Sequence, residues 1–273
     1  MNHRWSAVAF AVSWAVCLQA RAATPTFSTA GVTSYSPCGV GPDLPFSAPM
    51  ANSVANWFSF VGFPNVSRWT NGNVWGSDFR DGTDLDPGGG SDAPNIYFYN
   101  GHGICQNPPV ATSPDFITVC GDFGKPDTTT IGTSTRWGNA GGKLQFAIID
   151  ASCPMDLISL SNQWFPVLQG IHVAVGHSGS ATADTLNSNR RGTDFAAKIA
   201  VPPILSFFLP TMSVGDAWMT AGIEDIQSGG CCAVAIAAGA TEADAVNRRD
   251  NEKVTDGKSN PTPVWAAWRW ACR

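Results

Sequence analysis

The stretch NIYFYNGHG, residues 95–103, decides the fold class, because an uninterrupted apolar run ends there in polar residues and glycine. A second run of this kind, LQFAIIDASC, covers residues 144–153, and shorter runs lie at residues 171–175 and 232–237. Continuous apolar runs are typical of strands buried on both faces of a parallel sheet. The sequence therefore predicts four buried parallel strands, with a further peripheral strand at residues 264–270.

Helical patterns separate these runs. Leu157, Leu160, Trp164 and Leu168 follow one another at spacings of three and four, which places them on one face of a helix expected over residues 154–168. Shorter patterns at residues 48–61, 193–199 and 213–223 predict three more helices. The alternation predicts an α/β protein, a three-layer αβα sandwich with a mostly parallel sheet. We expect one domain over residues 23–273, with long loops at residues 81–92 and 105–142.

The first residues have the features of a secretory signal peptide, predicted at residues 1–22. Arg4 precedes an apolar stretch at residues 5–17, and Ala20-Arg21-Ala22 resembles a cleavage site. A lipoprotein signal at Cys17 is the alternative, but Val16 stands where a small residue is wanted. We therefore expect a secreted or periplasmic protein without a membrane segment after signal removal. The formal charge of −5 disfavours nucleic acid as a partner.

The cysteine count predicts disulfides. Of eight cysteines, Cys17 lies in the predicted signal, which leaves seven. Cysteines tend to pair in an oxidising compartment, so three disulfides and one free thiol are expected. Cys153 is predicted as the free thiol, and the other six as paired in an order that the sequence does not give. The competing interpretation is that several cysteines are buried and reduced.

Three histidines remain after the predicted signal: His102, His172 and His177. His172 lies inside an apolar run, which favours a core histidine with a satisfied side chain. Residues 176–180, GHSGS, resemble a nucleophile elbow, but no histidine follows them to complete a serine-hydrolase triad. His177 lies at the end of its predicted strand, so it is expected to support the site together with Asp150.

Metal signatures are weak. The sequence has neither a C-x-x-C pair nor an H-E-x-x-H motif, so a zinc site is not predicted. The acidic run formed by Asp78, Asp81, Asp84, Asp86 and Asp92 could bind calcium. Its spacing differs from that of an EF-hand, and a solvated acidic loop is the competing interpretation. No other cofactor is expected.

The two longest apolar runs end in complementary catalytic groups. His102 follows the first, and Cys153 follows the second. Because ligands bind at the carboxyl ends of parallel strands, we expect the two side chains to lie together if the strands are neighbours. A helix starting at Pro154 would lower the pKa of the Cys153 thiol through its dipole. The N–H groups of Gly103 and Cys153 are expected to form an oxyanion hole.

These two blocks, one ending in His-Gly and the other in Ala-Ser-Cys, resemble the caspase, gingipain and legumain clan of cysteine peptidases over about residues 92–175. The signature is also similar to that of an uncharacterised group of secreted bacterial proteins. The resemblance implies a caspase-like fold, with His102 as general acid and base, Cys153 as nucleophile, and Gly103 and Cys153 as oxyanion donors. Ser152 and the absence of a glycine in residues 154–156 depart from the clan's pattern.

The sequence thus predicts an exported cysteine peptidase-type hydrolase that acts on a peptide or protein. The alternative is a non-catalytic, tryptophan-rich binding module for a glycan or protein ligand. Its candidate ligand-binding side chains are Trp57, Trp69, Trp75, Trp137, Trp164, Trp218, Trp265, Trp268 and Trp270.

Overall fold

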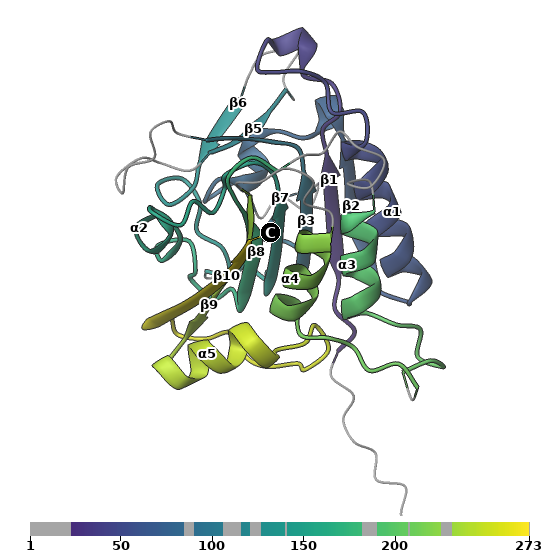
Figure 1. The fold of residues 1–273 in the computed structure, drawn as a ribbon, viewed down its shortest axis with the longest axis vertical. Helices are drawn as coiled ribbons and strands as arrows, with labels where there is room; N and C mark the ends of the chain where they lie inside the picture. Colours follow the sequence, from purple (N-terminus) through teal and green to yellow (C-terminus); the bar gives the residue numbers. More distant parts are fainter. Residues whose placement is uncertain are drawn as a thin grey trace, which may run out of the picture.

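The computed structural model describes residues 23–84, 90–105, 116–120, 127–139, 141–181, 190–206, 208–224 and 231–272. The predicted signal peptide at residues 1–22 lies outside these residues. Within them, a twisted central sheet carries helices on one side and a smaller sheet on the other (Figure 1). No described helix is both long enough and apolar enough to cross a membrane.

Seven strands form the central sheet, in the order β10-β9-β8-β7-β3-β1-β2. Their bounds are β1 Phe27–Gly31, β2 Asn65–Thr70, β3 Ile96–Asn100, β7 Phe146–Asp150, β8 Val173–Ser178, β9 Cys232–Gly239 and β10 Trp265–Cys272. The five strands from β2 to β8 pair in parallel, whereas β9 and β10 pair antiparallel to their neighbours. The structure thus confirms an α/β protein with a mostly parallel sheet.

The prediction that residues 232–237 form a parallel strand is wrong, because β9 is antiparallel to β8. Two helices, α3 (Arg191–Ile199) and α4 (Val214–Glu224), lie between these strands in the chain. The first carries the chain away from the carboxyl edge and the second returns it there, so β9 starts at the edge where β8 ends. A strand buried on both faces has the same apolar composition in either direction, so composition alone could not give its direction.

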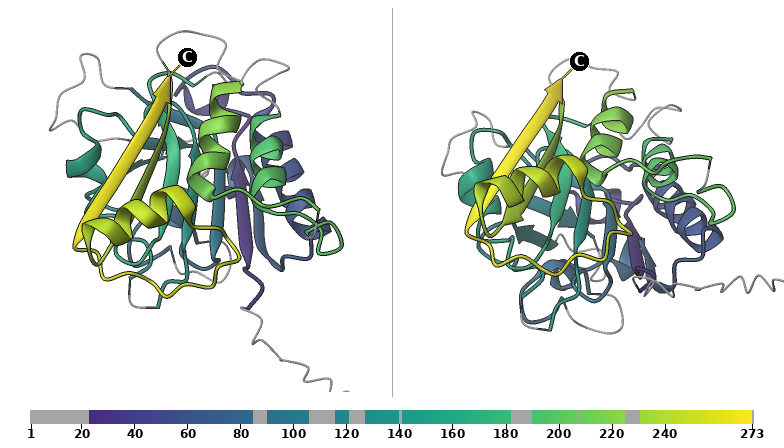
Figure 2. Two further views of the ribbon diagram at one scale, coloured as in Figure 1. Left: turned by 60° about the horizontal axis from the view of Figure 1, so that its bottom comes forward. Right: turned by 90° about the horizontal axis from the view of Figure 1, so that it is seen from below.

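One face of the sheet is covered by α1 (Ser47–Phe60), α3 and α4, as the views in Figure 2 show. These three helices match the patterns predicted at residues 48–61, 193–199 and 213–223. A fourth helix, α5 (Glu242–Asn251), packs against β9 and β10. The core on this face includes Phe58, Phe98, Phe195 and Trp218, all fully buried.

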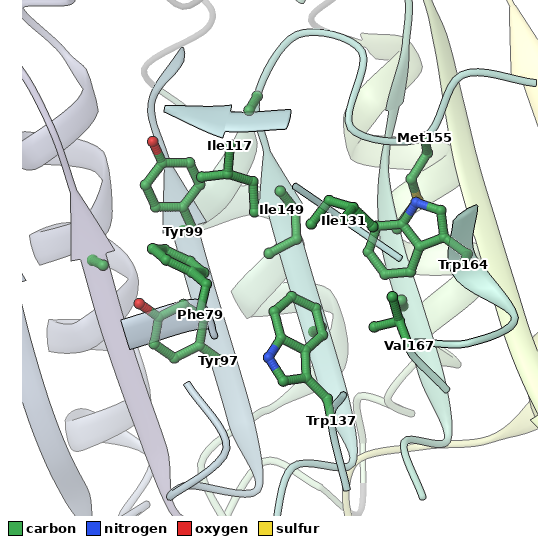
Figure 3. Packing of buried hydrophobic residues seen from close by; sticks show 14 of the residues in the cluster. Phe79, Tyr97, Tyr99, Ile117, Ile131, Trp137, Ile149, Met155, Trp164 and Val167 are labelled. Atoms are coloured by element: carbon green, nitrogen blue, oxygen red, sulfur yellow. The ribbon is translucent and has the colours of Figure 1, made fainter. Parts of the chain in front are cut away.

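The opposite face has a different cover. A three-stranded sheet of β4 (His102–Ile104), β5 (Phe116–Val119) and β6 (Asp127–Thr130) lies over it, with the short helix α2 (Leu160–Trp164). Three 3₁₀ helices complete the described elements: η1 Ser36–Cys38, η2 Asn71–Asn73 and η3 Gly76–Phe79. Figure 3 shows the aromatic core beneath, where Phe79 packs edge-on against Tyr97 and Tyr99. The outer layer on this face is therefore mainly strands and loops.

The helix predicted over residues 154–168 is much shorter than expected, since α2 spans only Leu160–Trp164. Pro166 lies within the predicted range, and proline disrupts a helix because it lacks an N–H donor. At the other end, the Met155 N–H donates to the His177 carbonyl at 3.1 Å. This bond holds the chain along the end of β8, so the helix does not begin at Pro154.

Three disulfides join Cys38 to Cys120, Cys105 to Cys153, and Cys232 to Cys272. The number matches the prediction, and such pairing fits a protein of an oxidising compartment. Among the described residues, however, the free cysteine is Cys231 and not Cys153. The prediction of a free Cys153 and a paired Cys231 is therefore wrong.

Candidate functional site

The strands that precede His102 and Cys153 are neighbours, as predicted. β3 and β7 pair in parallel, and their register continues to the pair Asn100 and Asp150. At the carboxyl edge the Gly101 N–H donates to the Asp150 carbonyl at 3.3 Å. The backbone thus delivers the two segments that follow β3 and β7 to the same edge of the sheet.

His102 is oriented by the loop that follows β1. Its Nε2 lies 2.8 Å from the Pro42 carbonyl oxygen, and its ring packs edge-on against Tyr35 at a centroid distance of 4.3 Å. Because a carbonyl oxygen only accepts, Nε2 carries the hydrogen in the neutral ring, and Nδ1 has the free lone pair. His102 is half-exposed. Its imidazole is therefore held in the tautomer that a general base requires.

The loop around His102 is rigid for identifiable reasons. Asp43 accepts hydrogen bonds from the backbone N–H groups of Tyr35 and Ser36 and from the Ser36 hydroxyl, at 2.6–2.8 Å. These bonds, the one from the Ser36 side chain above all, lower the pKa of Asp43. The Cys38–Cys120 disulfide then ties this loop to the end of β5. The Pro42 carbonyl is thus fixed opposite the imidazole.

The Tyr35 side chain connects this loop to the strand segment of His102. Its hydroxyl oxygen accepts the His102 N–H at 2.8 Å and lies 3.2 Å from the Tyr99 hydroxyl and from the Thr118 carbonyl. Tyr99 also donates to the Thr118 carbonyl, at 3.0 Å. Gly101 packs against both rings, since a side chain there would clash with the two hydroxyls. Neutral hydrogen bonds and close packing hold this half of the edge.

Cys153 lies at the same edge but forms a disulfide with Cys105, three residues after His102. The Cα atoms of the two cysteines are 5.0 Å apart. Cys153 is buried, and Cys105 is half-exposed. No hydrogen bond joins His102 to Cys153 among the described residues. The structure therefore brings the two segments together through the disulfide, and it does not contain the free thiol that was predicted.

The backbone of Cys153 differs from both expectations made for it. Its φ of 59° lies in the left-handed region, and its N–H donates to the Gly179 carbonyl at 3.0 Å. No helix begins at Pro154, so a helix dipole does not act on Cys153. Because its N–H is already bonded, the oxyanion hole predicted from Gly103 and Cys153 is not open at Cys153. Gly103 lies within β4, paired opposite Ile117.

Directly beneath this edge lies a buried polar group that we call the Asp150 cluster: Asn100, Asp150, His177, Arg191 and Cys231. The first three are the last or near-last residues of β3, β7 and β8, and they share the face of α1, α3 and α4. Arg191, in the first turn of α3, donates to Asp150 Oδ1 through Nε at 3.1 Å and Nη2 at 2.6 Å. Asn100 donates to the other carboxylate oxygen at 2.7 Å.

His177 extends this cluster to a thiol. Its Nε2 lies 3.2 Å from Asp150 Oδ1, and its Nδ1 lies 3.6 Å from the Sγ of Cys231. Because the carboxylate accepts, Nε2 carries the hydrogen and Nδ1 faces the thiol. The His177 ring also packs against Trp218 at 5.0 Å. The order thiol, imidazole, carboxylate is the arrangement of a cysteine nucleophile with its base and orienting acid.

The charge state of the cluster argues against this chemistry. Burial opposes ionisation of Asp150, but Arg191 and then His177 hold its pKa at about 2. Burial and the Arg191 charge lower the pKa of His177. Burial raises the pKa of Cys231 to about 11. A neutral thiol beside a neutral imidazole, with both side chains buried, is a structural arrangement rather than an open nucleophile.

His172 is a satisfied core histidine, as predicted. Its Nδ1 bonds to the buried carboxylate of Glu252, and its Nε2 lies 3.2 Å from the Asn260 side-chain oxygen. Arg248 and Lys258 also contact the Glu252 carboxylate. His172 therefore belongs to a structural ion-pair network at the amino edge of the sheet, opposite the edge that holds His102.

Sequence reasoning missed three members of the Asp150 cluster: Asn100, Arg191 and Cys231. Arg191 lies beyond residues 182–189 in a polar segment, where nothing marks it as buried. Cys231 was assigned to a disulfide because Cys153 was taken as the single free thiol among seven cysteines. The usable signal was the strand period: Asn100, Asp150 and His177 each follow the buried residues of one face by two positions.

Residues 29–272 match the family described as Domain of unknown function (DUF6345). The chain belongs to this family. The matched range includes His102, Cys153 and every residue of the Asp150 cluster. No curated protein matches the chain.

Proposed function

We propose that this DUF6345 protein is an exported cysteine hydrolase of caspase-like architecture, in which His102 and Cys153 act on a peptide or other acyl substrate. The observation that carries the proposal is the fixed His102 imidazole. The Pro42 carbonyl holds its Nε2, and the Cys105–Cys153 disulfide ties its segment to Cys153. An oriented imidazole at the sheet edge where the neighbouring parallel strand leads to a cysteine offers the two groups that thiol catalysis requires.

The proposal requires reduction of the Cys105–Cys153 disulfide. A dithiol reductant would supply two electrons and two protons, giving two thiols and its own disulfide. His102 would then take the proton from Cys153, and the thiolate would attack the acyl carbon to form a C–S bond. The C–N bond breaks as the amine leaves with the proton from His102. Water hydrolyses the thioester, which returns the thiol.

Asp150 would act as a positioning residue in this scheme. Its carbonyl accepts the Gly101 N–H, and its carboxylate anchors Asn100, the last residue of β3. Arg191 and His177 bind the same carboxylate. Asp150 therefore fixes the spacing of β3, β7 and β8 below the reacting groups. His177 would support the site through this contact, since its ring faces Cys231 and not the sheet edge.

The experiment replaces one cysteine of the disulfide so that the other is a free thiol. Cys105→Ser leaves Cys153 as a free thiol without added reductant. In this variant the rate of iodoacetamide labelling at Cys153 is measured against pH, and His102→Ala is measured in the same background. The proposal expects labelling that persists near pH 6 and an inflection that moves toward the ordinary thiol pKa of about 8.5 when His102 is removed.

Hydrolysis is tested with the same variant on a fluorogenic peptide library that covers all residues before the cleaved bond. Cys105→Ser with Cys153→Ala is the matched control and should be inactive. An ordinary labelling profile that is indifferent to His102→Ala would overturn the proposal. The Cys105–Cys153 disulfide would then be structural, and the binding-module alternative would replace the hydrolase.

One observation favours that alternative. Trp265, Trp268 and Trp270 on the edge strand β10 are 48%, 39% and 53% exposed. A hollow of about 260 Å³ lies between β10 and α5 and is lined by Trp265, Trp268, Glu242 and Arg249. Exposed indole rings beside charged donors and acceptors suit the faces and hydroxyls of sugars. Co-sedimentation with insoluble polysaccharides, lost in Trp268→Ala, would support the glycan-binding alternative.

A further inference from the structure

Residues 81–84 and 91–92, which we call the acidic turn, lie at the amino edge of β3 and β7, opposite the edge that holds His102 and Cys153. The Asp92 N–H donates to the Asp84 carbonyl at 3.0 Å, which joins the two parts. The Asp92 carboxylate accepts the N–H groups of Gly138 at 2.9 Å and Leu144 at 3.1 Å. Both aspartates are buried. The solvated acidic loop that competed with a calcium site is therefore not what Asp84 and Asp92 form.

This turn holds several buried oxygens that lack a hydrogen-bond partner among the described residues. Both carboxylate oxygens of Asp84 are in this state, and so is the hydroxyl of Ser91. The Thr135 hydroxyl is a fourth such group. The backbone carbonyl of its neighbour Ser134 accepts the Asp81 N–H at 2.7 Å. Leaving a buried polar group without a partner costs about 1–3 kcal/mol, and more for a charged group. Such a set of open oxygens indicates a missing ligand.

The open oxygens indicate that this ligand is a cation, because carboxylate oxygens accept and do not donate. Burial raises the pKa of Asp84 to about 7, the charges of Asp92 and Asp81 add to the effect, and the backbone N–H groups of Asp84 and Gly82 oppose it. Burial likewise raises the pKa of Asp92 to about 7, although the N–H groups of Gly138 and Leu144 oppose it. Two carboxylates that repel each other in a buried turn are stabilised when a divalent ion lies between them.

We propose that Asp84, Asp92 and Ser91 bind a hard divalent cation, Ca²⁺. Hard cations take oxygen ligands, and calcium accepts six to eight of them in flexible geometry, whereas magnesium demands a near-ideal octahedron. Within the described residues, no three His, Cys, Asp or Glu side chains form a metal-binding group. Two carboxylates would therefore supply the charge, and hydroxyl, carbonyl and water oxygens the remaining ligands.

Calcium binding at this site would stabilise one part of the fold, the acidic turn and the segment that it contacts. The turn at Asp84 and Asp92 would be fastened to the segment of Gly138, next to Trp137, in the aromatic core of Figure 3. Calcium would thus stabilise the loop-rich face of the sheet. Because the turn lies at the edge opposite His102, the inference does not depend on the proposed hydrolase activity.

The test uses the purified protein, stripped with EDTA and then titrated with CaCl₂. Extracellular calcium modules bind with Kd of about 10⁻⁴–10⁻³ M. At 100-fold excess over Kd, we expect Tm to rise by roughly 5–10 °C. Terbium is the second probe, since Trp137 lies near enough to the turn to sensitise its emission, and excess calcium should quench that signal by displacement.

Asp84→Asn is the decisive variant, because it keeps the shape of the side chain and removes its charge. It should abolish the calcium-dependent rise in Tm and should match or exceed the wild-type Tm in EDTA. Glu242→Gln, which removes an exposed carboxylate on α5, is the matched control and should respond to calcium like the wild type. A wild-type Tm that ignores calcium, together with no terbium emission, would overturn the proposal. The carboxyl groups would then be protonated rather than bound to a metal ion.

Discussion

Two histidine–cysteine regions lie at the carboxyl edge of the sheet, and they differ in almost every physical respect. We call His102 and Cys153 the upper region, and His177 and Cys231 the lower region. In the upper region His102 is half-exposed and oriented by a neutral carbonyl, and Cys153 is in a disulfide. In the lower region His177 is buried and bonded to the Asp150 carboxylate, and Cys231 is free. The lower region has a thiol–imidazole contact, since Cys231 Sγ lies 3.6 Å from His177 Nδ1. Proximity alone therefore does not identify a reactive cysteine.

The difference lies in access and charge. A thiolate needs water or a neighbouring cation to stabilise it, and a substrate must be able to reach it. Arg191 supplies a cation to the Asp150 cluster, but that charge is already paired with Asp150. The upper region has no buried charge, and neutral bonds to Tyr35 and Pro42 hold it. The paired charges of the lower region therefore stabilise the fold. The upper region has a half-exposed imidazole that is free to take part in a reaction.

The largest expected effect is the loss of unfolding free energy when the ion pair of the lower region is broken. Arg191→Met keeps the length of the side chain but leaves the Asp150 carboxylate buried without its cation. Removing one partner of a buried ion pair costs about 3–5 kcal/mol, so urea unfolding should show a loss of that size. His102→Ala is the matched variant in the upper region and should change the unfolding free energy by less than 1 kcal/mol. Equal losses in the two variants would contradict the division into two regions.

The acid dependence of stability should also come from the lower region. The folded pKa of Asp150 is about 2, below its ordinary value of about 3.9, so its contribution to stability is lost as pH falls from about 4 to 2. The folded pKa of His177 is lowered too, so unfolding takes up a proton below about pH 6.5. Asp150 and His177 should therefore lower the unfolding free energy from pH 7 to 5, and further below pH 4. Asp84 and Asp92, whose pKa is raised to about 7, act in the opposite direction between pH 7 and 4, so the contribution of the lower region is read from the difference between variants.

His177→Gln isolates the histidine part of this dependence. The glutamine amide can still donate to Asp150, but it does not titrate. Between pH 7 and 5, the unfolding free energy of the wild type should fall relative to that of His177→Gln, whereas His102→Ala should follow the wild type, as measured by urea midpoints at each pH. An identical pH dependence in the wild type and in His177→Gln would mean that His177 does not contribute to it.

The sequence predicted the part of the fold that rests on burial. The apolar runs before Asn100, Asp150 and Ser178 identified three central strands, because a strand covered on both faces has few alternatives to apolar residues. The adjacency of the segments after β3 and β7 followed from the same reasoning. β1 was not predicted, since Ser28 and Thr29 interrupt its apolar character; Ser28 is paired with the hydroxyl of Ser67.

The state of the candidate site could not be predicted in this way. The partner of Cys153 depends on where the chain after His102 runs, and seven cysteines allow many pairings. The burial of Arg191 depends on the approach of α3 to the sheet edge, which no local pattern encodes. The helix prediction over residues 154–168 gave too little weight to Pro166. Long-range contacts, rather than propensities, decide these features.

Thiol labelling compares the two regions directly. With a pKa of about 11, Cys231 carries at pH 8 only on the order of one thiolate per thousand molecules. Iodoacetamide should therefore label native Cys231 at least 10²-fold more slowly than Cys153 in the Cys105→Ser variant. In urea the two rates should converge. Peptide mapping of the alkylated protein measures both, and fast labelling of native Cys231 would mean that the lower region opens to solvent.

The smallest expected effect concerns the neutral bonds of the upper region. Tyr35→Phe removes the hydroxyl that accepts the His102 N–H and contacts Tyr99 and the Thr118 carbonyl. Loss of one partner in a buried neutral bond costs about 1–3 kcal/mol, and Tyr99 can still bond to Thr118, so the lower part of this range is expected. The loss should be independent of pH between 4 and 8, because burial raises the pKa of Tyr35 and keeps it neutral.

A double-mutant cycle with Tyr99→Phe sharpens this last comparison. The two hydroxyls lie 3.2 Å apart and share the Thr118 carbonyl, so the two single losses should not add. A coupling of about 0.5–1.5 kcal/mol, measured by urea unfolding, is expected for a neutral pair. If the upper region were instead held by charge, the coupling would change with pH or fall steeply with salt. Such a result would remove the physical distinction between the two histidine–cysteine regions, because both would then be ionic.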